Sequence, residues 1–130
     1  MIKIKHIDHT ADVGFLIEAS TLNELFKAAA IETFNVMANL KKIKSKITKK
    51  INLNNESIEQ LLFDFIEELI FLKDAHYLLF SRFKVKIKKD KNQYILAAAA
   101  EGEKINPKKH ELKVDVKAIT LHHFYVKKQG

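Results

Sequence analysis

Two helix-initiation motifs limit most strongly how this chain can fold. Thr21-Leu22-Asn23-Glu24 and Ser57-Ile58-Glu59-Gln60 both have the pattern of a capping box, in which a hydroxyl accepts the amide of the third residue along. Apolar residues then recur at helical spacing, which predicts amphipathic helices over residues 21–39 and from 57 to about 73. Whatever else the chain forms must therefore cover the apolar faces of two helices.

Most of the remaining chain alternates apolar with polar residues, and a period of two is typical of half-buried strands. The expected strands, seven or so, cover residues 2–7, 13–19, 41–54, 78–88, 93–100, 112–118 and a segment that begins at 124. We therefore expect a single α+β domain over residues 1–130, with two amphipathic helices packed on a mixed, largely antiparallel sheet.

Three local features refine this expectation. The lysines of residues 41–54 predict an exposed edge strand, because charges discourage pairing with another sheet. The small side chains at 97–100 indicate close approach by another element, such as a helix. Gly102 and Pro107 bracket an expected loop over residues 101–110.

Composition excludes several classes of protein. The chain has 130 residues, of which 47% are apolar and 30% charged, as in a soluble single domain. It has no cysteine, so any metal would be held by oxygen or imidazole. No apolar run approaches the roughly 20 residues that span a bilayer, so we expect a cytoplasmic protein with no membrane partner.

The formal net charge of +7 could favour RNA or another polyanion. However, Arg82 is the only arginine among the 23 basic residues, and no signature of basic and aromatic residues typical of RNA-binding modules is present. Lysines that alternate with isoleucine usually form a solvated strand face. A basic RNA-binding adaptor therefore remains an alternative interpretation.

A polar segment, His9-Thr10-Ala11-Asp12-Val13-Gly14, separates the first two expected strands. Its imidazole, hydroxyl and carboxylate, followed by a glycine, could bind a cation or a polar ligand. It could also be a hairpin turn in which Thr10 and Asp12 bond to their own backbone. Spacing favours the turn, because one aspartate with one histidine is not a metal signature.

The remaining candidate residues do not form a recognisable catalytic set. His122 and His123 are adjacent in an expected strand and would point to opposite faces, so at most one joins Asp12. Arg82, beside Ser81, could anchor a carboxylate or pair with a surface acid. The chain has no glycine-rich phosphate loop, nucleophile elbow or zinc-ligand helix, so we do not expect an enzyme.

Six segments in order over nearly the whole chain resemble the archease family. They are His9–Gly14, Thr21–Phe26, Leu79-Phe80-Ser81-Arg82-Phe83, Gly102-Glu103, Pro107–His110 and Val116–His122. The resemblance implies a small cytosolic accessory protein of the GTP-dependent tRNA-splicing ligase. Such a protein promotes guanylylation and multiple turnover of the ligase and broadens its nucleotide use. The resemblance also implies a divalent-metal site, with calcium as the expected ion, and contact with tRNA only indirectly and with no DNA.

By this resemblance, Asp12 matches the family's N-terminal metal-binding aspartate. The family's second aspartate lies in a last strand, and this chain stops at Gly130 before such a segment, so we expect that strand to be lacking and the site to be incomplete. His9, His110, Lys117 and His122 would line the same pocket, either as ligand contacts or as structural hydrogen-bonding groups. A chaperone-like module in tRNA processing is a further alternative.

Overall fold

The structure, a computed structural model, describes residues 2–8 and 13–113. Its elements are β1 (Ile2–Asp8), β2 (Val13–Ala19), α1 (Leu22–Asn35), the short 3₁₀ helix η1 (Leu40–Lys42), β3 (Ile47–Asn55), α2 (Ile58–His76), β4 (Leu78–Asp90) and β5 (Gln93–Lys104). Among these described residues, no helix is long and apolar enough to cross a membrane.

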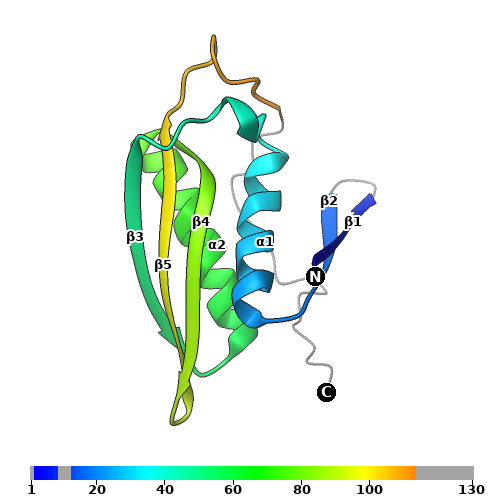
Figure 1. Ribbon diagram of the computed structural model, residues 1–130, viewed down its shortest axis with the longest axis vertical. Helices are drawn as coiled ribbons and strands as arrows, with labels where there is room; N and C mark the ends of the chain where they lie inside the picture. Colours follow the sequence, from blue (N-terminus) through cyan, green and yellow to red (C-terminus); the bar gives the residue numbers. More distant parts are fainter. Residues whose placement is uncertain (1, 9–12, 114–130) are drawn as a thin grey trace.

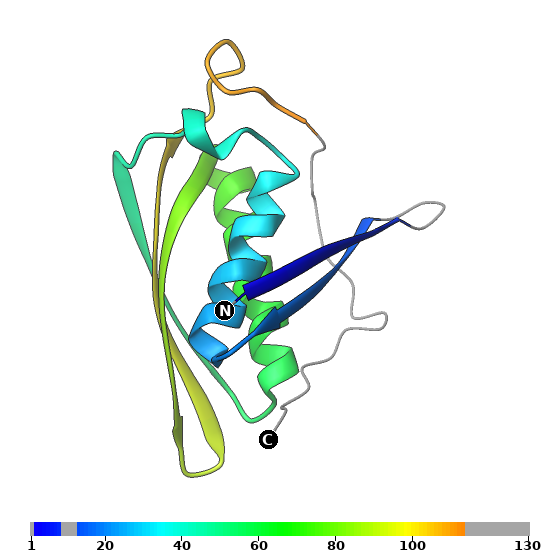
Figure 2. The same cartoon turned by 45° about the vertical axis from the view of Figure 1, so that its right-hand side comes forward.

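The described strands form two antiparallel sheets. β3, β5 and β4 lie side by side in that order, and β1 pairs with β2 in a separate two-stranded sheet. Both helices lie on one side of the three-stranded sheet, and α1 lies between this sheet and the β1–β2 hairpin (Figures 1 and 2). The expected α+β architecture is confirmed, although every described strand pair is antiparallel and none is parallel.

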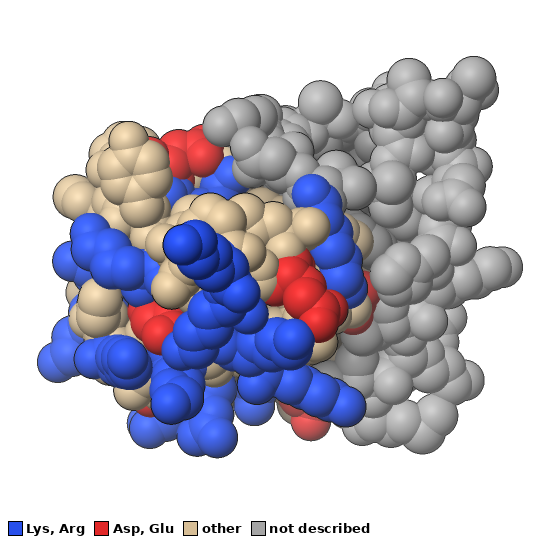
Figure 3. Space-filling view, turned by 90° about the horizontal axis from the view of Figure 1, so that it is seen from above, with Lys and Arg blue, Asp and Glu red and all other residues tan. Residues whose placement is uncertain are grey.

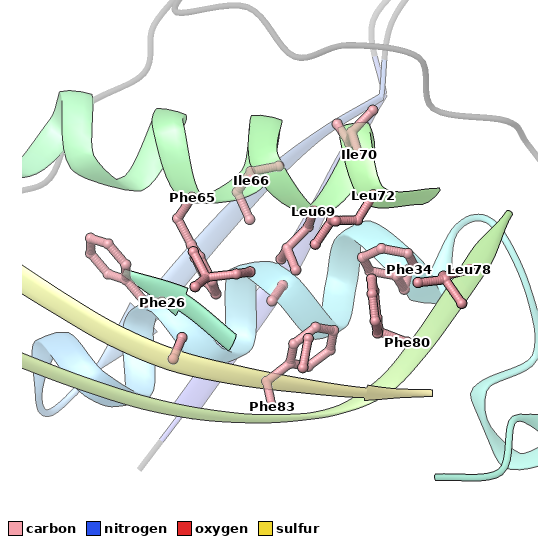
Figure 4. Packing of buried hydrophobic residues seen from close by; sticks show 14 of the residues in the cluster. Phe26, Phe34, Phe65, Ile66, Leu69, Ile70, Leu72, Leu78, Phe80 and Phe83 are labelled. Atoms are coloured by element: carbon pink, nitrogen blue, oxygen red, sulfur yellow. The ribbon is translucent and has the colours of Figure 1, made fainter. Parts of the chain in front are cut away.

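The hydrophobic core fills the space between the two helices and the three-stranded sheet (Figure 4). Phe26 of α1 stacks on Phe65 of α2, with ring centroids 6.0 Å apart. Phe34 of α1 meets Phe80 of β4 edge-on at 5.5 Å. Because aromatic pairs bury large apolar areas in preferred geometries, these contacts hold the helices against the sheet.

Both capping boxes form as the sequence predicts. The Thr21 hydroxyl accepts the Glu24 amide at 3.1 Å, and the Ser57 hydroxyl accepts the Gln60 amide at 3.2 Å. The helix ends differ from the prediction. α1 stops at Asn35 instead of residue 39, because the chain tightens into a turn before η1, and α2 continues three residues beyond 73 to His76.

The prediction of a loop over residues 101–110 is wrong about where the loop starts, because β5 continues to Lys104. Gly102 lies inside this strand, opposite both Ile47 and Phe80, and does not begin a loop. A Cβ atom on Gly102 would lie 1.8 Å from the Leu79 carbonyl oxygen. Glycine is therefore required by the close approach of the β4 backbone, which the sequence does not reveal.

Two other strand predictions have mixed outcomes. β3 is an edge strand as predicted, but its start is residue 47 instead of 41, and Ile51 is buried in the core. The alanine run faces both ways: Ala98 and Ala100 are buried among core residues, whereas Ala97 is exposed. The strands expected at 112–118 and from 124 fall almost wholly outside the described residues.

Candidate functional site

Much of the site expected from the sequence lies outside the described residues. This holds for Asp12 and for the associated His9, Thr10, Lys117 and His122. Gly14 lies in β2, opposite Ile7 of β1. The last pair of this ladder joins Asp8 to Val13, so the segment with Asp12 connects two paired strands, as the sequence predicts.

His110 is the predicted pocket residue that the structure places most clearly. Its side chain is fully buried, and its Nδ1 accepts the backbone amide of Asn106 at 2.9 Å. Because Nδ1 is an acceptor, Nε2 carries the proton and donates to Glu103 Oε2 at 3.1 Å. Of the two roles left open for His110, the described contacts are those of a structural hydrogen-bonding group.

Glu103 is the centre of this arrangement, which we call the Glu103 cluster: Glu103, His110, Lys109 and the backbone amide of Lys44. The Lys44 amide donates to Oε2 at 2.7 Å, and Lys109 Nζ contacts both carboxylate oxygens at 2.8 and 2.7 Å. These donors outweigh burial and lower the pKa of Glu103 to about 2, with Lys109 contributing most. Glu103 is therefore ionised throughout the neutral range.

The Glu103 cluster joins three segments at one end of the sheet. Glu103 belongs to β5, Lys44 follows η1, and Lys109 and His110 belong to the turn after β5. The carboxylate is already surrounded by donors and by two cations, Lys109 and, at 3.8 Å from Oε1, Lys46, so it offers little to a metal ion. Within the described ranges 2–8 and 13–113, no group of three or more histidines or carboxylates could hold one.

Ser81 and Arg82 are adjacent in sequence, but their side chains have different environments. Ser81 lies at a register irregularity between Phe80 and Arg82, and its hydroxyl donates to the carbonyl of Ile43 at 3.2 Å. Ile43 precedes Lys44, so Ser81 lies next to the Glu103 cluster. Arg82 is exposed and lies opposite Glu101 of β5.

The sequence prediction therefore missed Glu103 as the partner of His110, and it missed Lys44 and Lys109 as the other donors to Glu103. Glu103 and Lys109 occur in two of the family-like segments, but no role was assigned to them. One signal was present: an acid beside a strand glycine, seven residues before a histidine in a turn. Lys44 contributes only its backbone amide, and no side-chain pattern could reveal that contact.

The surface around this end of the molecule is basic. Figure 3 looks onto the end that carries η1 and the turn after β5, and shows lysine and arginine side chains over much of the described surface, with carboxylates between them. Glu111 pairs with Lys42 of η1, and this contact lowers the pKa of Glu111. An anionic partner would be attracted to this end.

Comparison with known proteins decides the family. The family model described as Archease protein family (MTH1598/TM1083) matches residues 5–130. The chain belongs to the archease family. It is 45% identical over 128 residues to Protein archease of Thermococcus kodakarensis, covering 98% of this chain and 90% of the relative.

Further relatives agree in sequence and in fold. Protein archease of Pyrococcus furiosus is 46% identical over 118 residues, which cover 91% of this chain and 83% of the relative. The solution structure of Methanobacterium thermoautotrophicum protein 1598 superposes with a TM-score of 0.85 at 33% identity, covering 97% of this chain and 89% of that one. The resemblance inferred from the six segments is confirmed.

Proposed function

We propose that this chain is a cytoplasmic accessory protein that activates a GTP-dependent tRNA-splicing RNA ligase. In this role it promotes guanylylation and multiple turnover and broadens nucleotide use, without catalysing a reaction itself. The observation that carries the proposal is membership of the archease family over residues 5–130. The basic surface at the η1 end supports it, because a ligase bound to RNA and GTP presents phosphate charge.

Asp12 is the residue through which we propose that activation occurs. Its carboxylate would help to hold a divalent cation, with calcium expected, and His9, Lys117 and His122 would line the same pocket. Calcium takes six to eight oxygen ligands, so Asp12 would need further donors, among them a second aspartate as in the family pattern. When bound, the cation would supply positive charge that offsets phosphate charge.

A second possible route to activation does not involve a metal ion. Asp12 would contact the ligase directly and stabilise the conformer that is competent for guanylylation, which is a population shift. Both routes predict loss of activation in Asp12→Ala. Only the first predicts that activation also falls in metal-stripped buffer and returns when calcium is added.

The test is single-turnover guanylylation of a tRNA-splicing ligase with labelled GTP, with and without this chain. Asp12→Ala should abolish the stimulation, whereas the matched control Asp90→Ala should retain it, because Asp90 lies at the exposed β4–β5 turn. A chain extended by a C-terminal strand with an aspartate provides a further arm. Failure of both the chain and its extended form to stimulate would refute the proposal.

A further inference from the structure

One face of the β3–β5–β4 sheet is turned away from α1 and α2, and we call it the outer face. Its side chains alternate with the core-facing ones along each strand. The outer face comprises Thr48, Lys50, Asn52 and Asn54 of β3, Gln93, Ile95, Ala97, Ala99 and Glu101 of β5, and Arg82, Lys84, Lys86, Lys88 and Asp90 of β4. No described helix covers it (Figures 1 and 2).

The strand register aligns long side chains on both sides of the small central ones. Ala99 is the register partner of both Lys50 and Lys84. Ala97 is likewise the partner of both Asn52 and Lys86. Since neighbouring strands lie about 4.8 Å apart, the flanking rows are about 10 Å apart across a floor of alanines. Along β4, successive outer-face cations are about 7 Å apart.

Core packing does not account for this alanine floor. Ala98 and Ala100 must be small because they are buried among core residues. Ala97 is exposed, and a threonine or valine there would favour a strand more than alanine does. Small side chains in the middle of a sheet face allow the backbone of a bound chain to approach the sheet closely.

The outer face also has a strong excess of positive charge. Five of its side chains, Lys50, Arg82, Lys84, Lys86 and Lys88, are exposed cations. Its two carboxylates lie toward its ends: Glu101 is opposite Arg82 near the Glu103 cluster, and Asp90, two residues beyond Lys88, is at the exposed β4–β5 turn. Edge protection explains lysines on β3 and β4, but it does not explain a row of four cations beside an alanine floor.

We propose that the outer face binds single-stranded RNA through its phosphate backbone. A shallow floor about 10 Å wide admits one strand and is too narrow for a duplex to settle between the rows. The lysine row of β4 would follow successive phosphates. The hydroxyl and amide groups of Thr48, Asn52 and Asn54 on β3 suit the ribose 2′-hydroxyl, which distinguishes RNA from DNA.

The same face predicts how the binding behaves. The described outer-face side chains include no aromatic ring for base stacking, so affinity should depend little on base sequence. Four phosphate contacts give a salt slope near −2.8, so affinity should fall about 50-fold between about 50 and 200 mM salt. Nothing in this proposal depends on activation of a ligase.

The test is fluorescence anisotropy of a labelled oligouridylate of about 12 nucleotides, with the matching oligodeoxythymidylate as comparison. Lys84→Glu with Lys86→Glu should weaken RNA binding about tenfold or more and flatten the salt slope. The matched control is Lys27→Glu with Lys91→Glu, which makes the same charge change at exposed lysines of α1 and of the β4–β5 turn, away from the η1 end. This control should retain most of the affinity.

A neutral variant separates the shape of the floor from its charge. Ala97→Gln places a longer side chain on an exposed strand position without changing charge, and should weaken RNA binding several-fold while the fold is retained, as checked by circular dichroism. Three results would overturn the proposal: undiminished binding by the Lys84/Lys86 variant, equal loss in both lysine pairs, or equal affinity for RNA and DNA.

Discussion

Removal of the Glu103 carboxylate should destabilise the folded protein, because the carboxylate is buried and three groups donate to it. Glu103→Gln keeps the shape of the side chain but leaves one acceptor oxygen for three donors. The Lys44 amide, Lys109 and His110 all donate to the native carboxylate. In the variant, the new NH₂ group would face donors, and a buried donor without an acceptor costs about 1–3 kcal/mol.

The magnitude follows from the pKa and the burial of Glu103. A pKa lowered from 4.5 to about 2 corresponds to about 3 kcal/mol, which solvent screening of the partly exposed Lys109 reduces to about 2 kcal/mol. Adding one unsatisfied donor gives an expected loss of about 3 kcal/mol in the free energy of unfolding. For a chain of this length the melting temperature should fall by about 10 °C.

The loss of stability in Glu103→Gln should also depend on pH, because the pKa of the Glu103 carboxyl is lower in the folded protein than in the unfolded chain. Its contribution is fully present above pH 4.5 and is lost as the pH falls toward 2. At about pH 3 the contribution of ionisation should be less than half its value near pH 7. The stability difference between the native chain and Glu103→Gln should therefore narrow in acid.

Urea unfolding followed by far-ultraviolet circular dichroism measures both effects. The matched control is Glu101→Gln, two residues earlier in β5 on the outer face, which should change the free energy of unfolding by less than about 0.5 kcal/mol. Equal stability of Glu103→Gln and the native chain near pH 7 would refute the reasoning. A difference that stayed constant down to pH 3 would refute the assigned ionisation.

Substitutions at three further positions test the fold. His110→Ala should lower the free energy of unfolding by about 2–4 kcal/mol in urea, because the ring is buried and bonded at both nitrogens; an unchanged midpoint would contradict its structural role. Gly102→Ala should cost more than about 3 kcal/mol, since its Cβ would overlap the Leu79 carbonyl, and a native melting temperature would contradict that close approach. Ser57→Ala should cost about 1 kcal/mol through loss of the bond to the Gln60 amide, whereas Ser57→Asp, which keeps a capping oxygen, should retain native stability; equal losses in both would contradict the capping role.

Local patterns predicted most elements because their causes are local. The capping hydroxyls of Thr21 and Ser57 act on amides three residues away, so each helix start could be located from sequence. Alternation along residues 78–88 and 93–100 likewise marked β4 and β5, although β5 runs to Lys104. That extension depends on pairing with β3 and β4, which alternation within one segment does not contain.

The site was predicted unevenly for a similar reason. Asp12 was selected from a short motif together with family resemblance, and it remains a prediction because it lies outside the described residues. His110 was selected as a pocket residue, but its partner Glu103 was not, because only the packed turn brings the two side chains to 3.1 Å. Ser81 donates to the backbone carbonyl of Ile43, next to the Glu103 cluster. A contact to a backbone carbonyl leaves no residue pattern in the sequence.

Residue order was enough for the fold class, the helix starts and the edge position of β3, because each depends on periodicity or capping within a short stretch. Membership of the archease family was obtained from the resemblance of six segments in order along the chain. Tertiary structure alone decided three other features: the use of Gly102 inside a strand, the environment of Glu103, and the alignment of Lys50 and Lys84 on either side of Ala99. These depend on contacts between segments far apart in the chain, and strand register sets those contacts.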